Sequence, residues 1–293
     1  MNKPASREEL HRLLERLTEA LPARDAGRLP LAPDTRFTEN GQEVPPTEGI
    51  WAIATAVRPH LLEFVDPGTG QAGFMTVAEE HGQPVGLTAR LKTAGSRISE
   101  LELIVARGGA PLFNPEGMSG PSPLLKSIEP ARRASRRQLI SAANAYFDAL
   151  VSGDGDSIPV SAECRRLENG THTVLVESTA FGSSLASQGL NLFEMGVAEQ
   201  INTQFFTYVI DRTRDRRFVV DEEQSLVVGF AAWDEGARST SAEVRGHGRV
   251  ELRAPFSKPH TNLVSEAFQI EDGRIRAIHA LFDYFPYGMK TGW

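Results

Sequence analysis

The sequence contains an internal repeat. Residues 6–41 align without a gap with residues 135–170 at a constant offset of 129, and 11 of the 36 aligned pairs are identical. Both segments end in Arg-x-x-Glu-Asn-Gly. Two later segments, Ala89–Gly95 and Ala267–Gly273, also resemble each other, and each is typical of a strand that leads through a glycine turn into a second strand. Such self-similarity indicates two copies of one structural unit, so the sequence predicts a chain of two similar halves.

Residues 108–127 separate the halves. They hold four glycines and four prolines, which the interiors of helices and sheets tolerate poorly. We therefore expect a linker here, between a first unit at residues 1–107 and a second unit at residues 128–293. The second unit is enlarged: the Glu of its Glu-Asn-Gly lies 53 positions before Asp221, whereas the same Glu in the first half lies 27 positions before Asp66.

Hydrophobic periodicity predicts a helix at the start of each half. Apolar or aromatic residues recur every three or four positions, at Leu10, Leu13, Leu14, Leu17 and Leu21, and again at Leu139, Ala142, Ala143, Tyr146, Phe147 and Leu150. Ser6 and Ser135 are each followed three positions later by Glu or Gln, the pattern of a capped helix start.

Later segments alternate between apolar and polar residues and predict strands. They are Phe205–Asp211, Arg217–Asp221, Leu226–Asp234, Glu243–Leu252, Leu263–Ile270 and Ile275–Tyr284. One helix packed against a curved antiparallel sheet is an α+β arrangement. The sequence predicts that this arrangement occurs twice.

Composition and charge limit the class of protein. A net charge of -7 over 293 residues argues against a nucleic-acid-binding protein, which needs a basic face. The single cysteine, Cys164, forms no intrachain disulfide, and the charged start of the chain is unlike a secretion signal. The longest apolar run, Leu226–Trp233, is too short to span a bilayer. We therefore expect a soluble cytoplasmic protein, with no membrane or nucleic-acid partner.

Three stretches of the second half resemble the nuclear transport factor 2-like superfamily. They are Ala145–Asp154, Arg165–Gly170 and the strand pair around Gly273–Ile275. That superfamily includes the ketosteroid isomerases, scytalone dehydratases and SnoaL-like polyketide cyclases. Arg214–Glu223 and Pro286–Trp293 look more narrowly like a less characterised branch found in fungi and bacteria. The resemblance implies two tandem cone-shaped α+β rolls, each with a sheet wrapped around a helix, and a possible homo-oligomer.

The resemblance also implies an apolar cavity with a few polar side chains. Tyr146 matches the helix tyrosine that donates a hydrogen bond to a developing oxyanion in ketosteroid isomerases; alternatively it only packs against the sheet. Glu168 or Asn169 matches the place of their general base, although Glu-Asn-Gly departs from the family pattern. Asn169 and Gly170 alternatively make a tight turn that Glu168 orders.

Strand residues supply further candidates. Side chains along a strand point alternately to its two faces. Tyr208, Arg212 and Arg214 are therefore expected on one face of a strand and Asp211 on the other. A buried Arg holds an enolate or carboxylate, whereas on an exposed strand these residues form a ladder of ion pairs. His260 and His279 are candidate acids or bases because histidine titrates near neutrality, or they are structural.

The remaining expectations concern cofactors and the substrate. The sequence lacks metal-ligand spacing, dinucleotide and P-loop motifs and Gly-x-Ser-x-Gly, so we expect no metal and no cofactor. We expect Cys164 to be a buried structural thiol. An insertion in the second half, Phe181–Gln204, is expected to form a helical lid. Besides Asn169 and Arg212, the residues expected to bind substrate are Met195, Phe205 and Trp233.

These features predict a cofactor-independent lyase, or else an isomerase. Its expected substrate is a small hydroxylated aromatic or polyketide-like compound, with lignin-derived compounds among the candidates, which it would dehydrate or deformylate by acid–base catalysis. The first half, with Leu17 in place of Tyr146, is expected to be a degenerate roll that mimics a dimer partner. A small-molecule-binding module and a purely structural association domain remain as alternatives.

Overall fold

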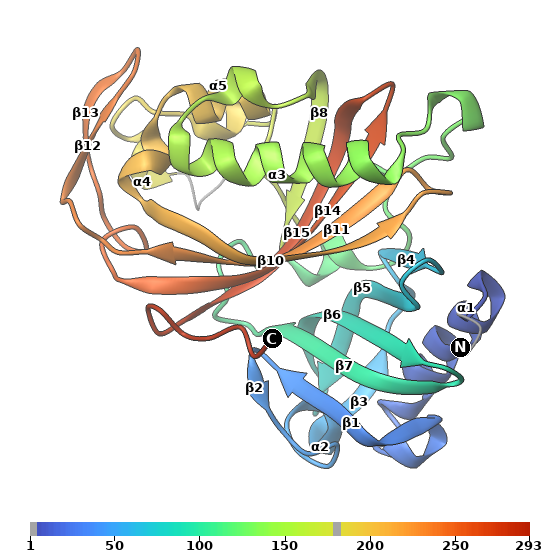
Figure 1. Ribbon diagram of the computed structural model, residues 1–293. Helices are drawn as coiled ribbons and strands as arrows, with labels where there is room; N and C mark the ends of the chain where they lie inside the picture. The colour runs from blue at the N-terminus through green and yellow to red at the C-terminus, as the bar shows by residue number, and fades with distance from the viewer. Residues whose placement is uncertain (1–4, 178–182) are drawn as a thin grey trace.

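The computed structural model describes residues 5–177 and 183–293 of the chain. It consists of two α+β rolls, each with a curved sheet and one long helix (Figure 1). The sheets face each other, and each helix lies on the face of its sheet that is turned away from the other roll. None of the helices in this described part is long and apolar enough to cross a membrane.

The first roll holds helix α1 (Arg7–Ala20) and a seven-stranded sheet. Its strands are β1 (Leu31–Glu39), β2 (Gln42–Glu43), β3 (Ala54–Val57), β4 (Leu62–Asp66), β5 (Gln71–Glu80), β6 (Gln83–Ala94) and β7 (Arg97–Ala106), with the short helix α2 (Ile50–Ile53) before β3. The strand order is β2-β1-β7-β6-β5-β3, and β4 pairs with β5. Only β1 and β7 run parallel among these pairs.

The second roll repeats this plan around helix α3 (Arg136–Ser152). Its six-stranded sheet has the order β10-β11-β14-β15-β8-β9, and β8 and β15 run parallel. The strands are β8 (Val160–Glu168), β9 (Thr171–His172), β10 (Ile210–Asp221), β11 (Leu226–Glu235), β14 (His260–Glu271) and β15 (Arg274–Phe285), and a separate hairpin joins β12 (Ser241–Val244) to β13 (Gly248–Glu251). Short helices α4 (Ser183–Ala186) and α5 (Val197–Asn202) precede β10.

The predicted helices and their capping boxes are confirmed. The N–H of Ser6 donates to Glu9 at 2.6 Å, and the N–H of Ser135 donates to Gln138 at 2.9 Å. Each capping bond satisfies a backbone donor that the first turn leaves without a partner.

Two strand predictions need correction. Phe205–Tyr208 is a turn of 3-10 helix, and the strand begins at Ile210, because Gln204 has a left-handed φ of 62° that breaks an extended chain. Glu243–Leu252 is a hairpin of two short strands, because Gly246 and Gly248, both at positive φ, turn the chain back.

The Glu-Asn-Gly motif fastens the first strand of each roll to the last. The Asn40 side chain accepts from the N–H of Val105 at 2.8 Å and donates to its carbonyl at 3.1 Å. Asn169 does the same with Phe282, at 3.0 and 2.8 Å. The following Gly170 has a φ of +87°, and a Cβ on it would lie 1.9 Å from a backbone oxygen, so only glycine fits there.

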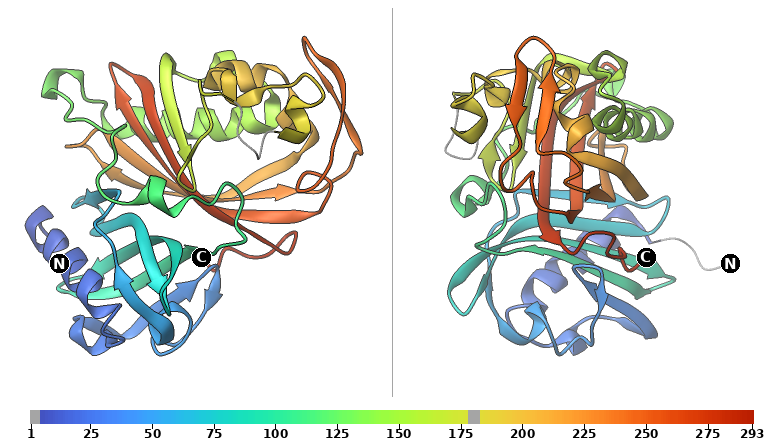
Figure 2. Two further views of the ribbon diagram at one scale, coloured as in Figure 1. Left: turned by 180° about the vertical axis from the view of Figure 1, so that it is seen from behind. Right: turned by 90° about the vertical axis from the view of Figure 1, so that its left-hand side faces the viewer.

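The segment 108–127, expected to be a linker, lies along the boundary between the rolls (Figure 2). It is bonded to both of them. The N–H of Ser122 donates to Leu61 in the first roll, and the N–H of Asn114 donates to Asn169 in the second. The segment therefore takes part in the packing between the rolls.

The two sheets bury one apolar interface. It contains Phe64, Met75 and Ile104 from the first roll and Val228, Phe230 and Leu281 from the second. Near its centre, the hydroxyls of Thr88 and Ser265 hydrogen-bond at 2.7 Å, although both residues are fully buried. These two residues occupy matching positions, because Thr88 pairs with Ile104 as Ser265 pairs with Leu281 in the equivalent hairpins.

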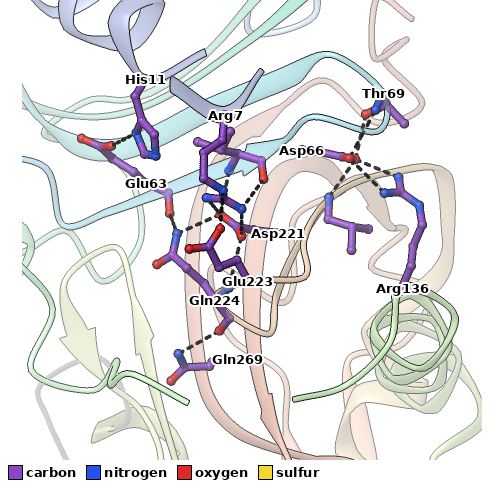
Figure 3. Close-up of polar contacts among 12 residues, drawn as sticks. Arg7, His11, Glu63, Asp66, Thr69, Arg136, Asp221, Glu223, Gln224 and Gln269 are labelled. Atoms are coloured by element: carbon purple, nitrogen blue, oxygen red, sulfur yellow. Dashed lines mark hydrogen bonds and ion pairs between the residues drawn. The ribbon is translucent and has the colours of Figure 1, made fainter. Parts of the chain in front are cut away.

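A reciprocal pair of ionic contacts crosses the same interface (Figure 3). Arg7, at the start of α1, contacts both carboxylate oxygens of Asp221 in the second roll, at 2.5 and 3.1 Å. Arg136, at the start of α3, contacts both oxygens of Asp66 in the first roll, at 2.8 and 2.9 Å. Arg7 and Arg136 are an identical pair of the repeat, so each roll inserts the same arginine into the other. This exchange is the pattern of a two-fold interface.

Both aspartates are buried and otherwise satisfied within the interface. Asp66 also accepts from the N–H of Val220, and Asp221 accepts from the N–H of Val65. Burial alone would raise the pKa of Asp66, but its hydrogen bonds from Arg136, Thr69 and Val220 outweigh burial and lower it. The ionised form of Asp66 therefore stabilises the fold above the ordinary pKa of an aspartate, and this stabilisation is lost as the pH falls.

We predict that Arg136→Ala lowers the free energy of unfolding by about 1–3 kcal/mol, because it leaves the buried Asp66 carboxylate without its cation. Urea unfolding at neutral pH measures the loss, and the difference from wild type should shrink in acid, where Asp66 is protonated. The exposed neighbour Arg137→Ala is the control. Equal stabilities of the two variants would contradict the role of this contact.

Candidate active site

A cavity of about 90 Å³ lies inside the second roll, between α3, the inner face of the sheet and the segment before β10. This volume is several times what one water molecule requires. Its wall is mostly apolar and rich in aromatic rings, among them Phe193, Phe205, Phe206, Phe256 and Phe282. The polar residues of the wall are Tyr146, Arg166, Glu168, Asn191, Gln200, Trp233, Glu235, Asn262 and Tyr284.

Strand register brings two carboxyl groups to one level of the sheet. Glu168 on β8 pairs with Ala280 on β15, which in turn pairs with Glu266 on β14. Residues in one such row share a face of the sheet. Arg166 lies two positions before Glu168 and shares its face. The small side chain of Ala280 leaves space between the two glutamates.

Arg166 is the centre of the deep end of the cavity. Its guanidinium donates to the Tyr146 hydroxyl at 3.1 Å, to Thr173 at 2.9 Å and to Gln200 at 2.7 Å, and it lies 3.1 Å from the Glu168 carboxylate. Gln200 is fixed in turn, because its amide nitrogen donates to the carbonyl of Thr173, just after β9, and to that of Leu192 in the segment that covers the cavity. Arg166 thus holds the tyrosine, a carboxylate and the covering segment in one arrangement.

Glu266 is fully buried, and neither of its oxygens accepts a well-formed hydrogen bond from the described residues. Burial and the nearby charge of Glu168 raise the pKa of Glu266 to about 8, while Arg166 and the Tyr146 hydroxyl lower it by less. Burial also raises the pKa of Tyr146 well above its ordinary value. At neutral pH the site therefore offers a protonated carboxylic acid and a neutral phenol.

The first roll lacks these polar groups at the matching positions. Leu17 matches Tyr146 and Phe37 matches Arg166 at the repeat offset of 129. Ala89 matches Glu266 by strand register. Leu103 on β7 pairs with both Glu39 and Ala89, just as Ala280 on β15 pairs with both Glu168 and Glu266. All three apolar residues are buried. The same architecture therefore forms without a polar interior.

A second polar group lines the cavity at the beginning of β14 and the end of β11. Asn262 lies on the same face of β14 as Glu266, and its amide nitrogen donates to Glu235 at 2.7 Å. The other Glu235 oxygen lies 3.2 Å from Nε2 of His260. Burial lowers the pKa of His260, but the hydrogen bond and charge of Glu235 outweigh burial and raise it. Glu235 and His260 thus form a partly buried ion pair.

The structure brings together some of the residues predicted from sequence. Tyr146, Glu168, Phe205 and Trp233 line the cavity, and His260 contacts it through Glu235. The covering segment contains the expected short helices over residues 183–204, whereas residues 181–182 of that insertion lie outside the described residues. Met195 packs partly buried against the core and is not part of the wall.

Other predicted residues lie away from the cavity. Arg212 and Arg214 both contact Asp234, at 2.6 and 2.8 Å, on the sheet face opposite to Trp233. Asp211 accepts from the Tyr287 hydroxyl and pairs with Arg238, and Tyr208 is 36% exposed.

Asn169 and His279 also have structural surroundings. The Asn169 amide is committed to backbone groups of Pro111 and Phe282. His279 contacts the Ser122 hydroxyl at 2.6 Å on the face toward the first roll, and burial lowers its pKa to about 3. Burial raises the pKa of Cys164 to about 12, as a structural thiol requires.

Sequence reasoning missed Arg166, Gln200, Glu235, Asn262 and Glu266 as site residues. The two-residue spacing of Arg166 and Glu168 on a predicted strand would have placed both on one face. In the same way, the even spacing of Asn262 and Glu266 would have placed both on one face of β14. No local pattern marks Gln200, whose role depends on how the covering segment folds.

The fold and the cavity define the chain as a protein of two α+β rolls with a polar cavity in the second roll. The family described as Domain of unknown function (DUF8021) has a model that matches residues 132–282, just over half of the chain. The chain belongs to this family. Among the described residues, no group of three or more His, Cys, Asp or Glu is placed to hold a metal ion.

Three solved structures similar to the chain each cover about half of it. An LEH-like epoxide hydrolase of M. tuberculosis has a TM-score of 0.30 and 14% identity, over 50% of this chain and 84% of that one. SalBIII, an epoxide hydrolase/cyclase-like enzyme in pyran ring formation in salinomycin, has a TM-score of 0.34 and 11% identity, over 52% and 98%. An NTF2-like protein of Burkholderia xenovorans LB400 has a TM-score of 0.31 and 12% identity, over 51% and 92%. No curated protein matches the chain.

We predict that Glu266→Gln makes the protein more stable than wild type as the pH rises. A raised pKa means that Glu266 favours the folded state below its unfolded pKa of about 4.3, and that this contribution is lost as the pH rises to about 8. Urea unfolding from pH 5 to pH 9 should show wild type losing stability relative to the variant, by a few kcal/mol in total. Exposed Glu129→Gln is the control. Parallel curves would contradict the raised pKa.

Proposed function

We propose that the second roll is a cofactor-independent acid–base enzyme, a lyase or an isomerase, that acts on a small, uncharged, hydroxylated compound with an apolar body. The observation that carries the proposal is the replacement of Leu17, Phe37 and Ala89 by Tyr146, Arg166 and Glu266 in two rolls of one chain. Burying a carboxyl group without a strong partner costs stability. The first roll does not bear this cost, so we attribute the polar interior of the second to chemistry.

The two glutamates suit different roles. Glu168 lies beside the Arg166 cation and serves as the base, whereas Glu266 keeps its proton at neutral pH and serves as the acid. In a dehydration, Glu168 accepts a proton from carbon, the electrons of that bond form the double bond, and the C–O bond breaks. Glu266 gives its proton to the departing hydroxyl, which leaves as water. A proton then passes from Glu168 to Glu266.

A deformylating cleavage uses the same groups. Glu168 accepts the proton of a substrate hydroxyl, the adjacent C–C bond breaks, and formaldehyde is released. Glu266 then protonates the carbon that has gained the electron pair. Tyr146 donates a hydrogen bond to the oxygen on which charge develops. The resemblance of residues 145–170 to cofactor-free isomerases, dehydratases and cyclases supports chemistry of this kind.

The apolar wall and the engaged arginine support an uncharged substrate. Arg166 already contacts Tyr146, Thr173, Gln200 and Glu168, so it has no free fork for a substrate carboxylate. The aromatic rings of the wall suit an aromatic or polyketide-like body.

We predict that Glu266→Gln lowers kcat by about 10²–10⁴-fold, the usual contribution of a general acid. The assay incubates chelator-treated protein with small aromatic alcohols and β-hydroxy ketones and detects loss of water or formaldehyde by mass spectrometry. Activity should decline as the pH rises through about 8, where Glu266 loses its proton. Glu129→Gln is the control for the substitution itself.

The opposite outcome favours a binding module. Tight binding of such compounds with no product, and with no effect of Glu266→Gln on affinity, would contradict the enzyme. Turnover that persists undiminished in Glu266→Gln would contradict the assigned acid.

A further inference from the structure

We infer that the cavity contains a specificity subsite, formed by Trp233 and Asn262, that binds a second hydroxyl group on the substrate. The inference rests on the proposed function for the deep end of the same cavity. It names the substrate class more closely: an elongated, uncharged molecule with one polar group at each end and an apolar body between them.

Trp233 and Asn262 each keep an unused hydrogen-bonding atom. Nε1 of Trp233 and Oδ1 of Asn262 are buried and have no hydrogen-bond partner among the described residues. The two residues pair directly across β11 and β14, and both line the cavity. They are 6% and 1% exposed, so neither reaches bulk water freely. A buried polar atom without a partner is rare, and its occurrence here suggests a ligand.

The chemistry of the two atoms selects a hydroxyl. The indole N–H only donates, and the amide oxygen only accepts. A hydroxyl is a small neutral group that accepts from the first and donates to the second. A carboxylate, an ether or a ketone could accept from the indole N–H. None of them has a hydrogen to donate to the amide oxygen of Asn262, which would stay without a partner.

The orientation of Asn262 is fixed by the ion pair behind it. Its Nδ2 donates to Glu235 at 2.7 Å, which leaves Oδ1 for the cavity. Glu235 contacts His260, and Nδ1 of His260 contacts the carbonyl of Lys258 at 2.7 Å. Each carboxylate oxygen of Glu235 therefore has a partner within the roll, in Asn262 and His260.

The register of β14 gives the length of the ligand. Asn262 and Glu266 lie on one face, four residues apart, which corresponds to about 13 Å along a strand. Glu266 belongs to the same row of the sheet as Glu168, which lines the cavity, so this distance separates the two polar ends of the cavity. Val264 lies between them on that face, and Phe282 lies beside it on β15. An aromatic ring with a short side chain bridges such a distance, with one oxygen at each end.

An unpartnered indole N–H alone is weak evidence, because Trp51 in the first roll has one too. Trp51 is buried in the apolar core and does not line the cavity. What distinguishes Trp233 is an unpartnered acceptor directly opposite it on the same cavity wall. Trp51→Phe is therefore a matched control for Trp233→Phe.

The test compares three probes by calorimetric titration: 4-(3-hydroxypropyl)phenol, 3-phenylpropan-1-ol and 4-propylphenol. The last two each lack one hydroxyl. We expect wild type to bind the diol about tenfold more tightly than either single alcohol, the value of one well-placed hydrogen bond. In Trp233→Phe the diol should lose its advantage over the single alcohol that lacks the hydroxyl bound by the subsite, and the affinity for that alcohol should stay unchanged. The advantage of the diol over the other single alcohol should remain, because that alcohol lacks the hydroxyl bound at the opposite end of the cavity. Trp51→Phe should keep the full advantage.

Several results would overturn the subsite. Wild type that binds all three probes alike, or none of them, contradicts it, and so does an undiminished advantage of the diol in Trp233→Phe. Circular dichroism establishes that each variant folds. If Trp233→Phe does not fold, Asn262→Leu tests the same subsite, because it should also abolish the preference for the subsite-bound hydroxyl. Because binding needs no turnover, an inactive protein that still discriminates the probes would contradict the enzyme and leave the subsite standing.

Discussion

The exchange of arginines between the two rolls is the contact on which the rest of the structure depends. Arg7 and Arg136 occupy the same position at the start of α1 and α3, and each binds a buried aspartate of the opposite roll with both of its terminal nitrogens. The apolar faces of the two sheets are thereby held against each other, with the Thr88–Ser265 bond near the middle. Each sheet is left with one inner face, covered by its own helix. In such a chain the first roll takes the place of a dimer partner for the second. Only the second roll then needs a polar interior for chemistry.

The comparison between the rolls separates what the fold requires from what chemistry requires. Both rolls have the glutamate of Glu-Asn-Gly, Glu39 in the first and Glu168 in the second. In the first roll its partners are structural, because Glu39 accepts from the N–H of Ile50 and the guanidinium of Arg107. Glu266, which has no counterpart in the first roll, has no such structural partner among the described residues. Glu266 in particular weakens the folded state at neutral and alkaline pH, because its charged form is disfavoured by burial. A residue that costs stability in one roll and is alanine in the other is better explained by proton transfer than by packing.

The sequence predicted the architecture better than the site. The repeat, the two capped helices and most strands follow from local patterns, because capping and alternation act over a few residues. Tyr146 and Glu168 were predicted through the superfamily resemblance of residues 145–170. Glu266 and Asn262 were missed because their surroundings come from strands far apart in sequence. Arg212 and Arg214 were candidates by their charge, yet alternation places them on the face away from the cavity, where Asp234 holds them.

The central claim is that one buried carboxyl group of the second roll keeps its proton at neutral pH. Carbon-13 NMR of protein labelled at the glutamate side-chain carboxyl tests it directly, with Glu266→Gln to assign the signal. The account predicts one glutamate resonance that titrates near pH 8 and is missing from the variant. If every glutamate, Glu266 included, titrated near the ordinary value of about 4.3, the second roll would hold no protonated carboxylic acid at neutral pH and the proposed chemistry would fail.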